Sequence, residues 1–298
     1  PICWMLLFLA IMGTWAPGAA AGATKTWDGS TGEWSDDARW TNGVPVPGDD
    51  VVINVGTVLL ASAATGLSSF KMNGGTLIYS NWTTYLEATN VTLLGGASKL
   101  PAAFLNGAMS NRIRIVCTNL LLGTNVTINA DAGGYDATNG PGAGSQGQYG
   151  CGGGHGGHGG LGNNTAVAGG GAYGESNAPM MPGSGGGYTA AGGNGGGVVM
   201  IEVAATASIF GVISANGTQA SEVSKGGGAG GSIYLACQVL QGATNGLLRA
   251  NGGSGWSSGS PGGGGRIAVI YDTNAQTGIN PGVRFAAARG IGGFSPAY

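Results

Sequence analysis

The two histidines of this 298-residue chain, His155 and His158, follow Cys151 closely in a Cys-x3-His-x2-His cluster. Thiolate and imidazole groups are common ligands for zinc and copper. The spacing matches no standard metal site. In a glycine-rich chain with a three-residue turn, residues three apart stand about 9.3 Å apart, which is too far for two imidazoles to share an ion. Two interpretations remain open: a zinc or copper site made by a folded loop, and exposed polar residues on a glycine-rich surface.

Five aspartates carry most of the acidity of the N-terminal part: Asp28, Asp36, Asp37, Asp49 and Asp50. A calcium ion needs six to eight oxygen ligands, which such a group could supply in part. Asp49 and Asp50 directly follow Pro47-Gly48 and precede an apolar run, which is the pattern of a turn that opens a strand. We expect the turn and keep calcium as the alternative.

The remaining carboxylates give no sign of an active site. A glycosidase needs two carboxyl groups facing each other across a cleft. The acids of the C-terminal two thirds are scattered and recur at no fixed position, and the chain has no phosphate-binding loop. We therefore predict no catalytic residues and no enzyme. A polysaccharide-active lyase or glycosidase remains the alternative, by analogy with the expected fold alone.

Glycine makes up 28 of the 65 residues between Gly133 and Gly197. Ordering a glycine costs roughly 0.5–1 kcal/mol more than ordering an alanine, so this stretch would cost on the order of 14–28 kcal/mol, against a net stability of about 5–15 kcal/mol. It is therefore either a disordered linker or a structure that only glycine can build. Because it carries aromatic residues and leads directly into strands, we expect closely packed, partly polyglycine-II-like chains.

The tyrosines of this stretch are candidates for binding. We expect Tyr135, Tyr149, Tyr173 and Tyr188 to be exposed on the glycine-rich surface, and we predict Tyr149, Tyr173 and Tyr188 as contact residues. Aromatic rings offer a large contact area at a low entropy cost, which suits sugar faces and partner surfaces.

A repeat follows the glycine-rich stretch. Gly197, Gly231 and Gly265 each end a glycine run, 34 residues apart, and each precedes a strand with alternating apolar residues and then a second short strand. A degenerate copy begins at Arg112. Fixed periods of this length indicate stacked units that share one core. The predicted fold is therefore all-β: a parallel β-helix, or β-solenoid, of stacked short strands.

The repeat makes several local predictions. The alternation places the following residues outward: Arg112, Arg114, Glu202, Tyr234 and Arg266. Ala-Asn-Gly ends two of the copies, and we expect it to form a sharp, left-handed corner. Cys117 and Cys237 occupy the same inward position of two copies, with the Val203 coil between them. Two strand spacings of about 4.8 Å exceed the reach of a disulfide, so these cysteines are not bonded to each other.

The chain divides into three predicted parts. Residues 1–23 contain an apolar run and small residues that are typical of a signal peptide. Residues 24–100 form an N-terminal β-helix cap region. Its expected strands are Val51–Ile53, Thr57–Leu60, Ser69–Met72, Gly75–Tyr79, Tyr85–Ala88 and Val91–Leu94. Residues 101–298 form the glycine-rich repeat solenoid, which continues the same stack.

The opening of the second part resembles known proteins. The order Trp27-Asp28-Gly29, Trp34, Trp40, Val44-Pro45 and Pro47-Gly48-Asp49-Asp50-Val51-Val52-Ile53 is similar to the start of secreted bacterial β-helix proteins, including G8-type modules and autotransporter-associated repeats. The glycine-rich repeats also resemble those of bacterial surface proteins and phage tail-tip adhesins. The resemblance implies a β-helix cap and a secreted or surface protein, and it implies no catalytic residue.

Composition completes the functional hypothesis. Charged residues make up 8% of the chain and its formal net charge is −2, which gives no basic surface for nucleic acid. No segment after the signal peptide is expected to span a membrane. We predict a secreted, non-enzymatic surface, matrix or structural protein that contacts polysaccharide, cells or copies of itself. Ice binding by a flat glycine-rich face is a further, minor alternative. We expect no cofactor, with calcium or zinc as the alternatives above.

Overall fold

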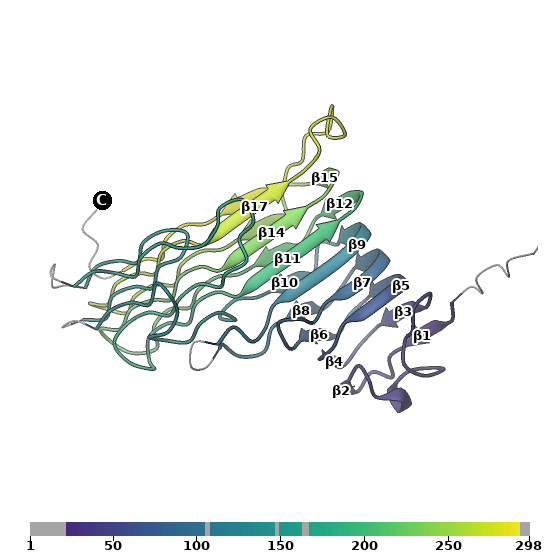
Figure 1. Ribbon diagram of the computed structural model, residues 1–298, viewed down its shortest axis with the longest axis horizontal. Helices are drawn as coiled ribbons and strands as arrows, with labels where there is room; N and C mark the ends of the chain where they lie inside the picture. Colours follow the sequence, from purple (N-terminus) through teal and green to yellow (C-terminus); the bar gives the residue numbers. More distant parts are fainter. Residues whose placement is uncertain (1–21, 105–107, 147–148, 163–166, 293–298) are drawn as a thin grey trace, which may run out of the picture.

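The chain folds into two all-parallel sheets of short strands, stacked in sequence order as in a parallel β-helix (Figure 1). This computed structural model describes residues 22–104, 108–146, 149–162 and 167–292. Within those ranges, the 3-10 turn η1 (Asp37–Arg39) is the only helical element. The predicted fold class is confirmed. The predicted signal peptide lies almost entirely outside the described residues.

Each coil of the stack contributes one strand to each sheet. The first sheet contains, in spatial order, β1 (Thr24–Thr26), β3 (Asp50–Ile53), β5 (Ala64–Met72), β7 (Leu86–Leu93), β9 (Ile113–Leu122), β11 (Val198–Val203), β14 (Ser232–Ala236) and β17 (Arg266–Ile270), with β12 (Thr206–Ile209) and β15 (Val239–Gly242) extending it beside β9. The second sheet contains β2 (Thr31–Glu33), β4 (Thr57–Leu60), β6 (Thr76–Tyr79), β8 (Ala97–Lys99), β10 (Thr127–Asn129), β13 (Val212–Ser214), β16 (Leu247–Arg249) and β18 (Arg284–Ala286).

The strand register confirms the predicted repeat. Val199 of β11 pairs with Ile113 of β9 and with Ile233 of β14, which in turn pairs with Ile267 of β17. The side chains of Ile113, Val199 and Ile233 are fully buried. Because every second side chain of these strands is apolar, each coil has one row of apolar side chains that faces the core. The rows of neighbouring coils pack against each other.

The predicted strands between residues 51 and 100 are present, with two differences. The strand expected at Ser69–Met72 begins earlier, at Ala64, in β5. The two runs expected at Tyr85–Ala88 and Val91–Leu94 form the single strand β7, which pairs along its length with β9. Both sheets continue past residue 100, since β7 pairs with β9 and β8 pairs with β10. Residues on the two sides of residue 100 therefore share one stack.

The glycine-rich segments form extended, hydrogen-bonded layers that continue from the strands at one side of the stack (Figure 1). Gly153 donates a backbone hydrogen bond to Gly227 and accepts one from Gly263, so segments far apart in sequence lie side by side. A β-carbon on Gly231 would lie 2.0 Å from the carbonyl oxygen of Gly197. Backbones approach here as closely as only glycine permits.

The Ala-Asn-Gly tripeptides do not form the left-handed corners that we expected. None of Asn216, Gly217, Asn251 and Gly252 has a positive φ. Asn216 instead uses its side chain to accept a hydrogen bond from the backbone N–H of Asn251 in the next coil. The prediction was wrong because an asparagine side chain can hydrogen-bond to the backbone of a neighbouring coil as well as to the backbone of its own turn.

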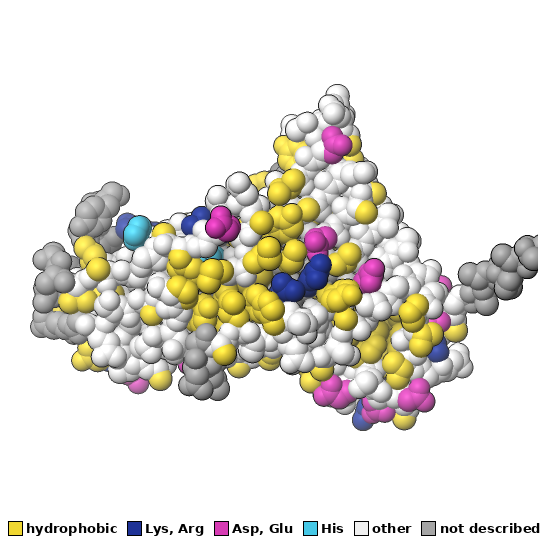
Figure 2. Space-filling model, viewed as in Figure 1, with side chains coloured by type: hydrophobic (Ala, Val, Ile, Leu, Met, Phe, Trp, Pro, Cys, Tyr) yellow, Lys and Arg dark blue, Asp and Glu magenta, His cyan; other side chains and the backbone are white. Residues whose placement is uncertain are grey.

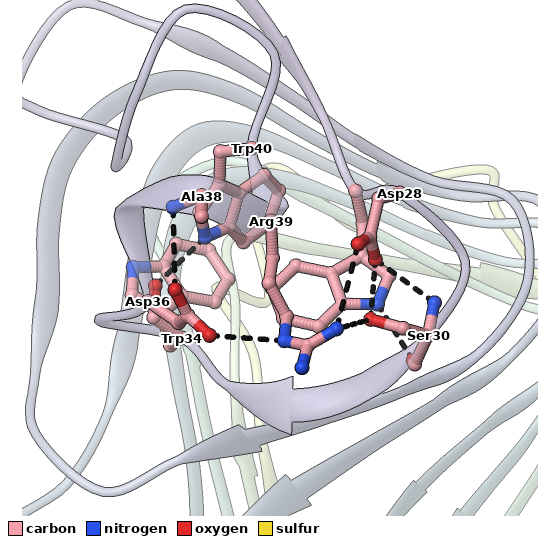
Figure 3. A network of polar contacts seen from close by, with 8 residues as sticks. Asp28, Ser30, Trp34, Asp36, Ala38, Arg39 and Trp40 are labelled. Carbon is pink, nitrogen blue, oxygen red and sulfur yellow. Dashed lines mark hydrogen bonds and ion pairs between the residues drawn. The ribbon is translucent and has the colours of Figure 1, made fainter.

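The N-terminal end of the stack is closed by three tryptophans. Trp27, Trp34 and Trp40 are buried and pack edge to face at 4.9 Å. The Trp40 indole donates to the Trp34 carbonyl oxygen, and Arg39 forms ion pairs with Asp28 and Asp36 on the outside of this cap (Figure 3).

The C-terminal end of the described stack is more open. Ile270 and Phe285 are about half exposed, at 47% and 52%. The edge of β15 is covered differently: the side-chain amide of Gln276 both accepts from the Leu240 N–H and donates to the Leu240 carbonyl oxygen, each at 2.8 Å. Gln276 thereby replaces the strand that would otherwise follow β15.

Candidate functional site

The structure does not gather the predicted metal ligands. Cys151 and His155 are buried, whereas His158 is exposed. The Cys151 sulfur accepts a hydrogen bond from the Gly162 N–H at 3.2 Å, and burial raises the pKa of this thiol. Across the described ranges, no group of three or more His, Cys, Asp or Glu side chains is placed to hold a metal ion.

His155 is a core residue of the glycine-rich layers. Its Nδ1 atom lies 2.9 Å from the Gly230 carbonyl oxygen, and its ring packs against Tyr173 with centroids 4.9 Å apart. Burial, together with a smaller effect of the nearby Arg266 guanidinium, lowers the pKa of His155 to about 4. The neutral imidazole therefore cross-links two glycine-rich segments, which is a structural role.

The N-terminal aspartates make structural contacts. Asp49 is buried and its two carboxylate oxygens accept from the backbone N–H groups of Ala23 and Val46, with Lys25 at 3.8 Å. These contacts form the turn that opens β3, as the turn interpretation predicts.

The four tyrosines of the glycine-rich stretch lie in different environments. Tyr135 is buried, with 4% of its surface exposed, so its predicted exposure was wrong. It packs edge to face on Phe104 at 5.6 Å. Tyr173 is half-buried, and its hydroxyl donates to the Pro182 carbonyl oxygen and accepts from Ser184. The Tyr173 ring therefore helps to hold the layers together.

Tyr149, Tyr188, Lys225 and Trp256 lie in glycine-rich segments that are joined to one another by backbone hydrogen bonds. The Lys225 ammonium lies over the Tyr188 ring, 3.6 Å from its centroid. The Trp256 N–H donates to the Lys225 carbonyl oxygen. Gly150, next to Tyr149, donates to Ser224. We call Tyr149, Tyr188, Lys225 and Trp256 the tip cluster.

The tip cluster is accessible yet firmly held. Trp256 is 44% exposed, while Tyr149, Tyr188 and Lys225 are half-buried. The glycines between these residues are packed: a β-carbon on Gly259 would lie 1.8 Å from the Lys225 carbonyl oxygen. The aromatic rings are thus presented by chains that have little room to move.

The backbone at the tips is also unusual. Tyr188 has φ of 103°, Ser224 has 63° and Ser257 has 54°. Residues other than glycine adopt such values rarely and at an energetic cost, and such positions cluster at binding sites. Three such values occur here, one in each of the three neighbouring loops that carry Tyr188, Lys225 and Trp256.

Sequence reasoning missed half of the tip cluster. It confined the contact surface to Gly133–Gly197, whereas Lys225 and Trp256 belong to the following repeat coils. A signal existed: each glycine-rich loop between the repeat strands carries a large side chain near its middle. Only the stacking of the loops shows that these segments lie side by side and that Lys225 contacts Tyr188.

No protein family, curated protein or solved structure against which the chain was compared matches it. No helix capable of crossing a bilayer occurs in the described part of the chain.

Proposed function

We propose that this protein is a secreted, non-enzymatic surface or matrix protein that attaches to polysaccharide or to cell surfaces through the tip cluster. The observation that carries the proposal is the Tyr188–Lys225 pair together with the exposed Trp256, whose backbone N–H donates to the Lys225 carbonyl oxygen, within closely packed glycine-rich layers. The β-helix serves as the scaffold that stacks these loops.

The chemistry of the tip cluster suits sugar faces. Aromatic rings provide flat apolar area, and their hydroxyl, indole and ammonium groups can hydrogen-bond to sugar hydroxyls. Because the glycine-rich layers are already packed, binding would cost little further conformational entropy. Lys225 is the only charged member, so attachment is expected to depend weakly on salt.

Two features of the sequence support the extracellular setting. The predicted signal peptide would direct export, and the Trp27–Ile53 opening resembles that of secreted bacterial β-helix proteins. The fold agrees with that resemblance at the level of a parallel β-helix.

The test is an attachment assay with insoluble polysaccharides such as cellulose and chitin, and with bacterial and eukaryotic cells. We expect Tyr188→Ala combined with Trp256→Ala to reduce the bound fraction at least fivefold, and Tyr149→Ala to reduce it less. Tyr271→Ala is the matched control, since Tyr271 is similarly exposed, at 43%, outside the tip cluster.

Melting curves accompany each variant. Unchanged attachment by the double variant with an unchanged melting temperature would overturn the proposal. An equal loss in Tyr271→Ala would also count against it. Release of reducing sugar ends by the parent protein would overturn the non-enzymatic part and favour the polysaccharide-active alternative.

A further inference from the structure

The last strand of the first sheet, β17, has one open edge. It pairs with β14 on one side, and no strand among the described residues lies on its other side. The Arg266 N–H donates to the Gly231 carbonyl oxygen, which shows that the backbone groups of Arg266 face β14. Because these groups alternate in direction along a strand, those of Ile267 and Val269 point away from the stack.

The apolar side chains at this end are only partly covered. Ile267 follows Val199 and Ile233 in one apolar row of the core, but it is partly exposed whereas they are fully buried. Figure 2 shows hydrophobic side chains (yellow) gathered on the surface below the loop that follows β17, where Figure 1 places this strand. At the open end, a hollow of about 320 Å³ is lined by Leu240, Ile267, Val269, Tyr271, Pro281 and Phe285.

The opposite end of the first sheet is closed. Trp27 forms an antiparallel bridge with Trp40. The Thr41 N–H donates to the Thr26 carbonyl oxygen, so the chain at residues 40–41 lies along the free side of β1. This end therefore presents no open edge to β17 of another copy, which argues against head-to-tail stacking.

The edge of β17 also lacks the features that keep free edges apart. Natural edge strands carry prolines, bulges or charges that point toward the core. The sequence of β17 is Arg-Ile-Ala-Val-Ile, the strand pairs with β14 without a register shift, and it turns Ile267 and Val269 toward the core. This composition favours pairing of the edge with another strand.

We propose that two copies of this chain associate at this end, with β17 of one copy pairing antiparallel to β17 of the other across a two-fold axis at Ala268. The contact continues the coil-to-coil interface of the stack, and it closes as a dimer because each copy uses the same edge. This goes beyond the proposed function, because the contact lies at the end of the stack, on residues outside the tip cluster.

An axis at Ala268 matches the free backbone groups. It places Ile267 of one copy opposite Val269 of the other, and each such pair can exchange two hydrogen bonds. It places the two copies of Ala268 opposite each other, with their Cα atoms about 4.5 Å apart. The inner faces of both copies stay on the same side of the joined sheet, so the partly exposed apolar side chains cover each other.

The register also keeps the arginines of β17 apart. Arg266 lies opposite Ile270 of the other copy, and its Nε donates to the Tyr173 carbonyl oxygen of its own copy. The charged side chains of the last described coil, which carry a net positive charge, are Arg266, Asp272, Arg284 and Arg289. Because salt screens the repulsion between two such ends, the dimer should not weaken as salt rises.

Sedimentation velocity of this chain over a hundredfold range of concentration tests the dimer. We expect an equilibrium between monomer and dimer that shifts to the dimer as the concentration rises. Val269→Lys adds an inward-pointing charge to the edge and should weaken the dimer at least tenfold. Val55→Lys is the matched control: Val55 is 60% exposed in the first coils of the stack, and its substitution should leave the equilibrium unchanged.

Two cysteine variants test the register. Ala268→Cys places two thiols across the axis, within the Cα–Cα range of about 4.4–6.8 Å that a disulfide allows. Ile270→Cys lies on the same outer side of β17, but the two copies of residue 270 are four residues out of step, on the order of 13 Å apart. With oxidised glutathione, Ala268→Cys should form a covalent dimer. Ile270→Cys and the parent chain, which has the same native cysteines, should not.

A parent protein that stays monomeric over the whole range would overturn the proposal, and so would equal weakening by Val269→Lys and Val55→Lys. If Val269→Lys does not fold, equal yields of covalent dimer from Ala268→Cys and Ile270→Cys do so instead.

Hydrogen exchange identifies any other occupant of the edge. The Ile267 and Val269 amides should exchange more slowly in the dimer than in the monomer. Slow exchange of both amides in a monomer would show that another segment of the chain covers β17, and would also overturn the proposal. Tyr188→Ala with Trp256→Ala should retain the dimer, so this contact and the tip cluster fail or succeed separately.

Discussion

The Asn216 side chain accepts a hydrogen bond from the backbone N–H of Asn251 in the next coil, at 2.8 Å. The same contact recurs on both sides. Asp131 accepts from the Asn216 N–H at 2.6 Å, and Asn251 accepts from the Ala288 N–H at 2.9 Å. One side-chain oxygen per coil thus joins consecutive coils at the point where the short strands end and the glycine-rich layers begin.

We predict that Asn251→Ala lowers the free energy of unfolding by about 0.5–1.5 kcal/mol, because the Ala288 N–H loses its acceptor. Asn251→Asp keeps an acceptor at the same place and should cost less. Chemical denaturation of the three proteins measures the difference. Equal stability of wild type and Asn251→Ala would show that water replaces this bond.

Gly231→Val should destabilise the fold by roughly 2 kcal/mol or more, because its β-carbon would overlap the Gly197 carbonyl oxygen. Gly171→Ala is the control: nothing lies within 4 Å of its β-carbon position, and its φ is not positive. Thermal melts compare them. If Gly231→Val and the wild type had the same melting temperature, the glycine-rich layers would not be closely packed at this position.

His155 should make stability depend on pH. The pKa of His155 is lowered to about 4 in the folded state, against about 6.5 in the unfolded state. Between pH 6.5 and pH 4, the unfolded chain therefore binds a proton at His155 that the folded chain does not bind. This contribution is fully present above pH 6.5 and is lost as the pH falls towards 4. The shift corresponds to a loss on the order of 3 kcal/mol.

The measurement is the free energy of unfolding at pH 7.5 and pH 4.5, for wild type, His155→Gln and His158→Gln. Carboxylates also respond to pH in all three proteins, so the comparison between variants isolates the histidine. His155→Gln should lose part of the pH dependence, and His158→Gln should keep it. The reverse pattern would contradict the buried placement of His155.

Gln276→Ala should cost about 2–3 kcal/mol, because both backbone groups of Leu240 lose their partner at the edge of β15. Gln241→Ala removes the same side chain from an exposed site of the same strand and should be nearly neutral. Hydrogen exchange at the Leu240 amide gives a local readout. Unchanged protection there in Gln276→Ala would rule out the edge-covering role.

The cysteines should resist alkylation in the folded protein. Burial raises the pKa of Cys117 to about 12 and that of Cys237 to about 11, so little thiolate is present near neutral pH. β11 separates their coils and both thiols are free. Iodoacetamide at pH 8 should label them slowly, and quickly after denaturation. Non-reducing mass mapping that finds a Cys117–Cys237 bridge would refute the stacking order.

The repeat and its fold class could be read along the chain. Apolar alternation and a 34-residue spacing are local patterns, and stacking is the arrangement that buries every such row, as the Ile113–Val199–Ile233–Ile267 register shows. The close approach of backbones at Gly231 was also predictable. Ordering so many glycines costs conformational entropy, and close backbone packing, which a β-carbon would prevent, explains why they are present.

Contacts between coils could not be read in this way. Asn216 looked like a corner residue because a turn is the local use of Asn-Gly, and only the neighbouring coil supplies the N–H that its side chain accepts. His155 and Tyr135 looked exposed among glycines, yet segments more than 70 and 40 residues away bury them. The tip cluster likewise combines Tyr188, Lys225 and Trp256 from three coils. Which side chains converge depends on how the glycine layers stack, and that is set by the backbone hydrogen bonds between layers, which leave no pattern in the order of residues.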